Sequence, residues 1–229
     1  IVNVLPGAAI DTIIANGGNG GNAIRISDSM PFTSDVITIE DASVSGQSNA
    51  LNLTGGDDVI NITNSTLFGI STVIELFGSG TKTVNVVNST LFSPGFDAIS
   101  ISNSATGSMI TITDSMLTGT TDHAIDATGG DDEIIITNSK LTGDNAVLNL
   151  SNGDDTVTLN TGAELIGNIE CDEGFDTLIF AMMVPTDQIA EITARIESKS
   201  PAGDSIIINK LFYEWTECED LVANLQPGL

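Results

Sequence analysis

The sequence predicts an all-β chain folded as a three-faced, right-handed parallel β-helix of about seven or eight coils, closed by a small α/β C-terminal cap. The first observation behind this prediction is a unit of about 24 residues, clearest in residues 124–143 and repeated in residues 50–69 and 146–167. The second is the alternation of aliphatic and polar residues in three short segments of each unit, which is typical of strands with one buried face. The third is the composition, with only 4% aromatic residues and many small polar ones, which favours short strands joined by tight turns.

Three columns of aliphatic residues define the expected core, because corresponding residues recur once per coil. The first column consists of Val2, Ile24, Leu51, Ile74, Ile99, Ile125, Leu148 and Ile169. The second consists of Ile37, Ile60, Val84, Ile110, Ile134, Val157 and Leu178. The third consists of Val44, Leu67, Leu91, Leu117, Leu141 and Leu165. Since stacked strands lie about 4.8 Å apart, the coils are expected to form a rod roughly 35 Å long.

A polar column follows the second strand of each coil. It begins at Asp41 and continues through Asn64, Asn88, Asp114 and Asn138. A serine comes directly after each of the last four: Ser65, Ser89, Ser115 and Ser139. Stacked amide side chains can hydrogen bond between neighbouring coils and satisfy backbone groups at a corner. The column is therefore interpreted as structural.

The repeat is expected to end near residue 180, so that residues 1–180 form the β-helix and residues 181–229 form the cap. A helix is predicted to begin at residues 185–187, with Ile189, Ile192 and Ile196 on one face. Strands are predicted over residues 206–209 and 211–215. A capping-box pattern at residues 216–219 predicts a last helix containing Leu221, Val222 and Leu225. This cap would cover the open strand edges and the exposed core at one end of the rod.

The other end of the rod has no comparable covering segment in the sequence. Residues 1–4 already have the pattern of a first strand, so this end is expected to be truncated or covered by another molecule. Because the first residue is Ile1 rather than Met, the chain is expected to be a processed form or a piece of a longer protein. The open end motivates a homo-oligomer assembled through coil ends, in which a head-to-tail contact can propagate as a filament.

The charge excludes two classes of partner. The chain has 31 acidic residues against 6 Lys and Arg, a formal net charge of -25. No basic surface is available for a nucleic acid or an anionic membrane. No apolar run approaches the 18 or so residues of a membrane span, so no membrane insertion of this segment is expected.

Two cysteines, Cys171 and Cys218, are too few for a disulfide scaffold and lack the spacing of metal ligands. They could form one disulfide that ties down the C-terminal segment, or they could be two inert buried thiols. The sequence leaves both alternatives open.

Paired aspartates at two turns are the strongest chemical feature of the sequence. Asp131 and Asp132 belong to one coil and Asp154 and Asp155 to the next, so their carboxylates are expected to stack roughly 5 Å apart. Like charges this close repel unless solvent or a cation intervenes, and oxygen ligands suit Ca²⁺. The turns resemble half of the Gly-Gly-x-Gly-x-Asp repeat of calcium-binding RTX β-rolls, but they lack its middle glycine and recur about every 24 residues rather than every nine. The alternative is a Gly-Asp turn with solvated acids.

No catalytic site and no cofactor are expected. His123 is the only histidine, with Asp122 and Asp126 nearby, but no nucleophile stands at a suitable spacing. Polygalacturonases and pectate lyases share the predicted fold. Of the polygalacturonase motifs Asn-Thr-Asp, Asp-Asp, Gly-His-Gly and Arg-Ile-Lys, this sequence has only Asp-Asp. The coils also leave no long loops to wall a substrate cleft.

The Asn-Ser bends, the Gly-Gly-Asp-Asp turns and the cap after the last coil resemble those of secreted bacterial β-helix repeat proteins, including the passenger domains of autotransporter-type adhesins. The resemblance implies a non-catalytic structural or adhesive rod, extracellular or on the cell surface, whose partner is a surface receptor or glycan. Fold analogy carries function no further than this. Two alternatives stay open: a carbohydrate-binding or polysaccharide-degrading protein, and a calcium-stabilised surface module.

Overall fold

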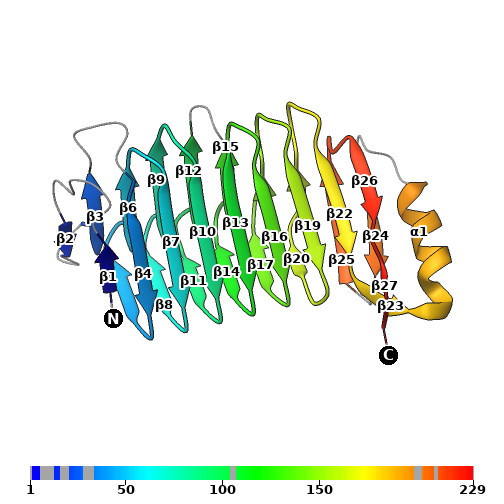
Figure 1. The fold of residues 1–229 in the computed structure, drawn as a ribbon, viewed down its shortest axis with the longest axis horizontal. Coiled ribbons are helices and arrows are strands. Elements are labelled where there is room, and N and C mark those ends of the chain that lie inside the picture. Colours follow the sequence, from blue (N-terminus) through cyan, green and yellow to red (C-terminus); the bar gives the residue numbers. More distant parts are fainter. Residues whose placement is uncertain are drawn as a thin grey trace.

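The computed structural model describes residues 2–5, 13–15, 21–27, 34–103, 107–198, 203–208 and 211–228. It confirms the predicted architecture: the chain winds into a parallel β-solenoid with three sheets along a rod (Figure 1). Within the described residues, six coils place one strand in each of the three sheets. Strands β21 and β22 begin a seventh coil in the first and second sheets only.

The first sheet contains, in spatial order, β2 (Ile13–Ala15), β3 (Ile24–Ser27), β6 (Leu51–Thr54), β9 (Ile74–Gly78), β12 (Ile99–Asn103), β15 (Ile125–Thr128), β18 (Leu148–Asn149), β21 (Ile169–Glu170), β25 (Leu211–Thr216) and β24 (Gly203–Ile208). The second contains β1 (Val2–Leu5), β4 (Val36–Glu40), β7 (Asp58–Thr63), β10 (Lys82–Val87), β13 (Ser108–Thr113), β16 (Glu133–Thr137), β19 (Thr156–Asn160), β22 (Thr177–Ala181) and β26 (Asp220–Ala223). The third contains β5 (Ser43–Gly46), β8 (Thr66–Gly69), β11 (Thr90–Ser93), β14 (Met116–Gly119), β17 (Lys140–Gly143) and β20 (Glu164–Ile166). Strands β23 (Met183–Pro185) and β27 (Gln226–Gly228) form a separate pair.

The aliphatic columns stack as predicted from the second member of the first column onward. Ile110 lies beside Val84 on one side and Ile134 on the other, and all three side chains are fully buried. In the first column Ile24 pairs with Leu51, and in the third Leu117 pairs with Leu141. Each parallel strand therefore contributes its inward side chains to one continuous core.

The N-terminal strand differs from the prediction. Val2 lies opposite Ile39 because β1 pairs antiparallel with β4 in the second sheet, so Val2 does not head the first column. Strand β2 likewise pairs antiparallel with β3. Antiparallel pairing satisfies a free sheet edge without a further complete coil, which is why the rod has fewer coils than the seven or eight predicted. The end expected to be open is thus covered in two of the three sheets; residue 1 lies outside the described residues.

The cap begins as predicted. A 3₁₀ turn, η1 (Thr186–Gln188), leads into α1 (Ile189–Glu197), whose Ile192 and Ile196 are buried. Strands β24 and β25 form the predicted antiparallel pair, although residue 209 of the first predicted strand lies outside the described residues. Tyr213 and Trp215 are buried, and both rings pack edge-on against Phe180. Figure 1 shows α1 at the end of the rod opposite β1 and β2.

The predicted last helix is wrong. The residues after Glu219 form β26, which pairs parallel with β22 and places Leu221 opposite Leu178. A capping-box glutamate would bond to the start of its own helix. Here the Glu219 carboxylate instead accepts a hydrogen bond from the backbone N–H of Asp176 in the preceding coil, at 2.8 Å. Pairing with the open edge of β22 overrides the local helical signal.

After the cap helix, the chain returns to the coils, and strands β25 and β26 continue the first and second sheets next to β21 and β22. Cys171 and Cys218 form a disulfide, so the first of the two cysteine alternatives holds. The bond joins the turn after β21 to the turn between β25 and β26, which face each other in successive coils. No helix in the described part of the chain is long and apolar enough to cross a membrane.

The stacked core gives a matched pair of substitutions on adjacent residues of β16. Ile134 is fully buried and pairs with Ile110, whereas Ile135 points outward and is half-buried. We expect Ile134→Ala to lower the free energy of unfolding by about 2–5 kcal/mol, because it leaves a cavity in the column. The same change at Ile135 should cost about 1 kcal/mol or less. Denaturant unfolding of both variants measures the difference, and equal losses would contradict the stacked core.

Candidate functional site

The corner after the second sheet is built on a left-handed backbone. Asp41, Asn64, Asn88, Asp114 and Asn138 all have positive φ, between 44° and 50°. Asn and Asp tolerate this conformation better than other residues that have a side chain, because their short polar groups bond locally. The same requirement in every coil accounts for the regular Asn/Asp positions in the sequence.

These corner side chains form a ladder along the rod. The Asn138 amide donates to the Asp114 carboxylate at 2.6 Å, and the Asn88 amide donates to the Asn64 carbonyl at 2.8 Å. The Asn64 amide in turn donates to Asp41 at 3.2 Å. All of these contacts join successive coils, which fits the structural role inferred for the column.

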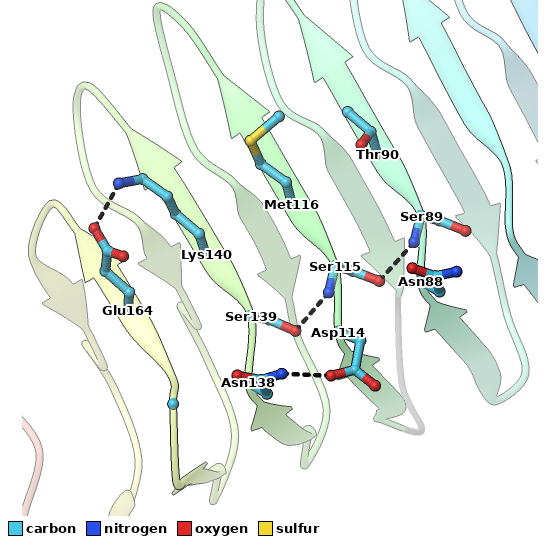
Figure 2. A pocket seen from close by; sticks show the side chains of 11 residues that line it. Asn88, Ser89, Thr90, Asp114, Ser115, Met116, Asn138, Ser139, Lys140 and Glu164 are labelled. Carbon is cyan, nitrogen blue, oxygen red and sulfur yellow. Dashed lines mark hydrogen bonds and ion pairs between the residues drawn. The ribbon is translucent and has the colours of Figure 1, made fainter.

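The serines of the corner form a second, buried ladder (Figure 2). The Ser139 hydroxyl donates to the Thr137 carbonyl and accepts the backbone N–H of Ser115 at 3.0 Å. The Ser115 hydroxyl likewise accepts the backbone N–H of Ser89. Each serine therefore satisfies one buried N–H and one carbonyl that the bend removes from the strand pairing.

A shallow depression of about 420 Å³ lies over this corner (Figure 2). Asn138 and Lys140 line it, and Lys140 forms an ion pair with Glu164 at one side. Gly162 takes the corner position in the next coil, where a Cβ would lie 2.7 Å from the Asn138 side-chain oxygen. The depression is polar and open, and its asparagine amides and serine hydroxyls are engaged in the two ladders.

The turn before the second sheet holds a different column, made mainly of acids. Its members in successive coils are Asp35, Asp58, Lys82, Ser108, Asp132, Asp155, Asp176 and Glu219. The carboxylate of one coil accepts a backbone N–H of the coil before it: Asp132 N–H donates to Asp155 at 2.6 Å, and Asp155 N–H donates to Asp176 at 2.8 Å. We call this set the acid column.

The N-terminal half of the acid column contains its own cation. Lys82 is fully buried and lies 2.7 Å from the Asp58 carboxylate, and its ammonium also donates to the carbonyls of Gly55 and Gly56. Burial raises the pKa of Asp58 to about 6, although Lys82 works in the opposite direction. A buried carboxylate is tolerated here because it is paired and hydrogen bonded.

The C-terminal half has no such cation among the described residues. Burial raises the pKa of Asp132 to about 7, of Asp155 to about 8 and of Asp176 to about 6, and neighbouring acids add to each shift. One carboxyl oxygen each of Asp155 and Asp176 is buried without a hydrogen-bond partner, whereas Ser108 of the preceding coil contacts the Asp132 carboxylate and partly offsets the rise of its pKa. Protonation of these groups relieves a desolvation cost that ionised carboxylates would carry.

The four aspartates predicted to bind calcium fall into two parallel columns. Asp132 and Asp155 lie in the buried acid column, whereas Asp131 and Asp154 lie outside it, where the Asp154 N–H donates to Asp131 at 3.0 Å. The acids stack between coils as expected. Backbone N–H groups take one oxygen of Asp131, Asp154 and Asp155. Calcium at this turn stays a prediction.

Sequence reasoning missed the residues that occupy a column position but differ in type from the other members of that column. Lys82 and Ser108 occupy positions of the acid column where the spacing, but not the chemistry, matches Asp132. Asp97 was also missed. It contacts His123 one coil later, at a corner where the turn lengths vary. No motif marks these residues. Aligning successive coils residue by residue and reading across each turn would have found them.

The comparisons with known proteins return nothing: the chain matches no protein-family model, no curated protein and no solved structure.

The acid column makes stability depend on pH. In the unfolded chain these carboxyl groups ionise near pH 4, whereas in the fold Asp132, Asp155 and Asp176 keep protons up to about pH 6–8. The folded state therefore binds more protons between about pH 4 and pH 8, and the free energy of unfolding falls as the pH rises. Since one pKa unit corresponds to about 1.4 kcal/mol, we expect the free energy of unfolding to fall by several kcal/mol between pH 5 and pH 8.5 in denaturant titrations.

The variant Asp155→Asn should flatten this pH dependence, since its amide oxygen still accepts the Asp132 N–H while no buried charge forms. Asp154→Asn, on the exposed position beside it, is the matched control and should keep the wild-type slope. Equal slopes in the two variants would rule out the acid column as the source.

Proposed function

We propose that this chain is a non-catalytic structural or adhesive rod that works outside the cell or on its surface. The observation that carries the proposal is the continuous aliphatic core with tight corners; the depression described above, over one of these corners, is shallow and polar. Enzymes and small-ligand binders normally enclose their ligand in a deeper, mostly apolar cleft. A flat and long surface suits contact with a large partner.

One further feature supports an extracellular location. The Cys171–Cys218 disulfide is of a kind that persists in oxidising compartments. The resemblance to secreted β-helix repeat proteins in the bends, turns and cap points the same way, as an analogy.

The adhesive contact is assigned to an aromatic strip on the outer face of the third sheet. Phe68 and Phe92 stack with their ring centroids 6.0 Å apart on adjacent strands. The following turns add Ile70 and Phe96, whose side chains are 41% and 54% exposed, and a Cβ on Gly95 would lie 2.2 Å from the Ile70 carbonyl oxygen. Exposed apolar patches of this kind mark interaction sites, and aromatic rings are frequent anchors of binding. A surface receptor or glycan is the partner expected here.

This assignment is tested by binding to a panel of immobilised polysaccharides and extracellular-matrix proteins. We expect Phe92→Ala to weaken binding to any captured partner by about tenfold or more, because it removes one ring of the stacked pair. Phe175→Ala is the matched control, since Phe175 is 61% exposed but lies at the turn before β22. Equal binding by both variants would contradict the strip, and turnover of any polysaccharide would contradict the non-catalytic role.

End-to-end assembly is a second proposal, and the third sheet favours it. Among the described residues, β5 and β20 are the two terminal strands of that sheet, whereas antiparallel strands cover both edges of the first sheet and one of the second. Parallel pairing of β20 with β5 of another copy would continue the sheet. Light scattering should then show a mass that rises with concentration. A constant monomer mass would remove assembly and leave the rod intact.

A further inference from the structure

A cluster of one histidine and three acids lies at the corner between the third and first sheets. Asp97 precedes β12, and His123 occupies the corresponding turn before β15 in the next coil. The His123 Nδ1 atom is 3.1 Å from the Asp97 carboxylate and 3.1 Å from that of Asp122. Asp126 on β15 completes the group: one ligand atom from each of Asp97, His123 and Asp126 lies within 4.8 Å of the others.

The charges in this cluster do not balance. Three carboxylates surround one imidazole, so the cluster stays negative even when His123 is protonated and Asp126 is neutral. The two side chains Asp97 and His123 are nine-tenths or more buried, and no Lys or Arg of the described residues forms an ion pair with any of the three acids. A single Nδ1–H shared between two carboxylates gives each of them a weaker hydrogen bond. Both observations favour a bound cation.

The residues around the cluster hold the candidate ligands in place. The Asn145 amide nitrogen lies 3.3 Å from His123 Nε2. With a metal ion on Nδ1 the proton sits on Nε2, and the amide turned over would accept it through its oxygen. Asn149 donates to one Asp126 oxygen at 2.9 Å, and the His123 backbone N–H donates to Asp97 at 3.0 Å. Metal-binding histidines and carboxylates are typically oriented by such outer hydrogen bonds.

The turn that carries His123 has little freedom. A Cβ added to Gly119, at the end of β14, would lie 1.9 Å from the His123 carbonyl oxygen, so the backbone crosses here at a distance that only glycine permits. The imidazole therefore starts from a backbone fixed by packing. A site on rigid elements keeps its ligand geometry better than one on a long loop.

We propose that Asp97, His123 and Asp126 bind a divalent first-row transition-metal ion of the Zn²⁺ type, with Asp122 near enough to supply a fourth ligand. Two ligands of one tetrahedral zinc ion are about 3.3 Å apart, which is close to the present Nδ1–carboxylate separation. Imidazole nitrogen suits zinc, cobalt and nickel, whereas Ca²⁺ prefers oxygen ligands alone. This site is separate from the aspartate turns predicted to bind calcium and does not depend on the proposed adhesive role.

Binding is measured by titrating Zn²⁺ into the chelator-treated chain of 229 residues at neutral pH, by calorimetry, with excess Ca²⁺ present to occupy weak surface acids. We expect one site per chain with a Kd at or below about 10 µM. Co²⁺ in place of Zn²⁺ should give visible absorption bands of a nitrogen- and oxygen-coordinated ion, at the same stoichiometry.

Variants locate the site. His123→Gln and Asp126→Asn should each remove the site or weaken it at least tenfold, and Asn145→Ala should weaken it by about tenfold through the ring orientation. Asp131→Asn, an acid at another turn, is the control and should bind as the wild type does. Equal affinity in His123→Gln and Asp131→Asn would overturn the proposal.

The unmodified chain gives an independent test that does not depend on the folding of any variant. Its single histidine provides one set of imidazole resonances in NMR spectra. Zn²⁺ should shift these resonances in a saturable manner, with the same affinity as in calorimetry. Resonances that stay unchanged at saturating Zn²⁺, or the absence of saturable binding, would show that no such site exists.

Discussion

The parallel register between coils is the constraint on which the rest of the structure depends. Each inward side chain has to find a similar side chain one coil before and one coil after, as Ile110 does with Val84 and Ile134. A shift by one residue would move every aliphatic side chain of a strand to the outer face. The three corners must therefore return the chain to the same register in every coil, and most of the polar sequence serves this purpose.

The corners solve this problem with side chains that replace strand pairing. Where the backbone bends, amides, hydroxyls and carboxylates accept or donate the hydrogen bonds that the strands no longer provide. The Ser ladder does so without charge, and the carboxylates of the Asn ladder, Asp41 and Asp114, are exposed to solvent. The acid column does so with carboxylates, which are good acceptors for N–H groups but are costly to bury. Lys82 offsets this cost in one half, and the other half keeps protons at unusually high pH.

The sequence was sufficient to predict the parts of the fold that repeat. The columns, the corner residues Asn88 and Asn138, and the start of the cap helix follow from local periodicity and were placed correctly. The two ends were not, because a strand such as β1 or β26 is decided by the free edge it meets rather than by its own pattern. Glu219 shows this directly: its local motif predicts a helix start, yet it serves the neighbouring coil. Single residues that break a column, such as Lys82, need coordinates to be assigned.

The interleaving of cap and coil limits how a rod of this design can change its length. Strands β25 and β26 return to the first and second sheets after the helix, and the disulfide fastens them to the preceding coil. New coils appended at that end would have to displace a segment that is covalently attached, and β1 and β2 occupy two sheets at the other end. The rod can therefore gain or lose only whole coils in its middle, because each middle coil pairs in parallel with a coil on either side. Relatives of different length should share both ends and differ by multiples of one repeat.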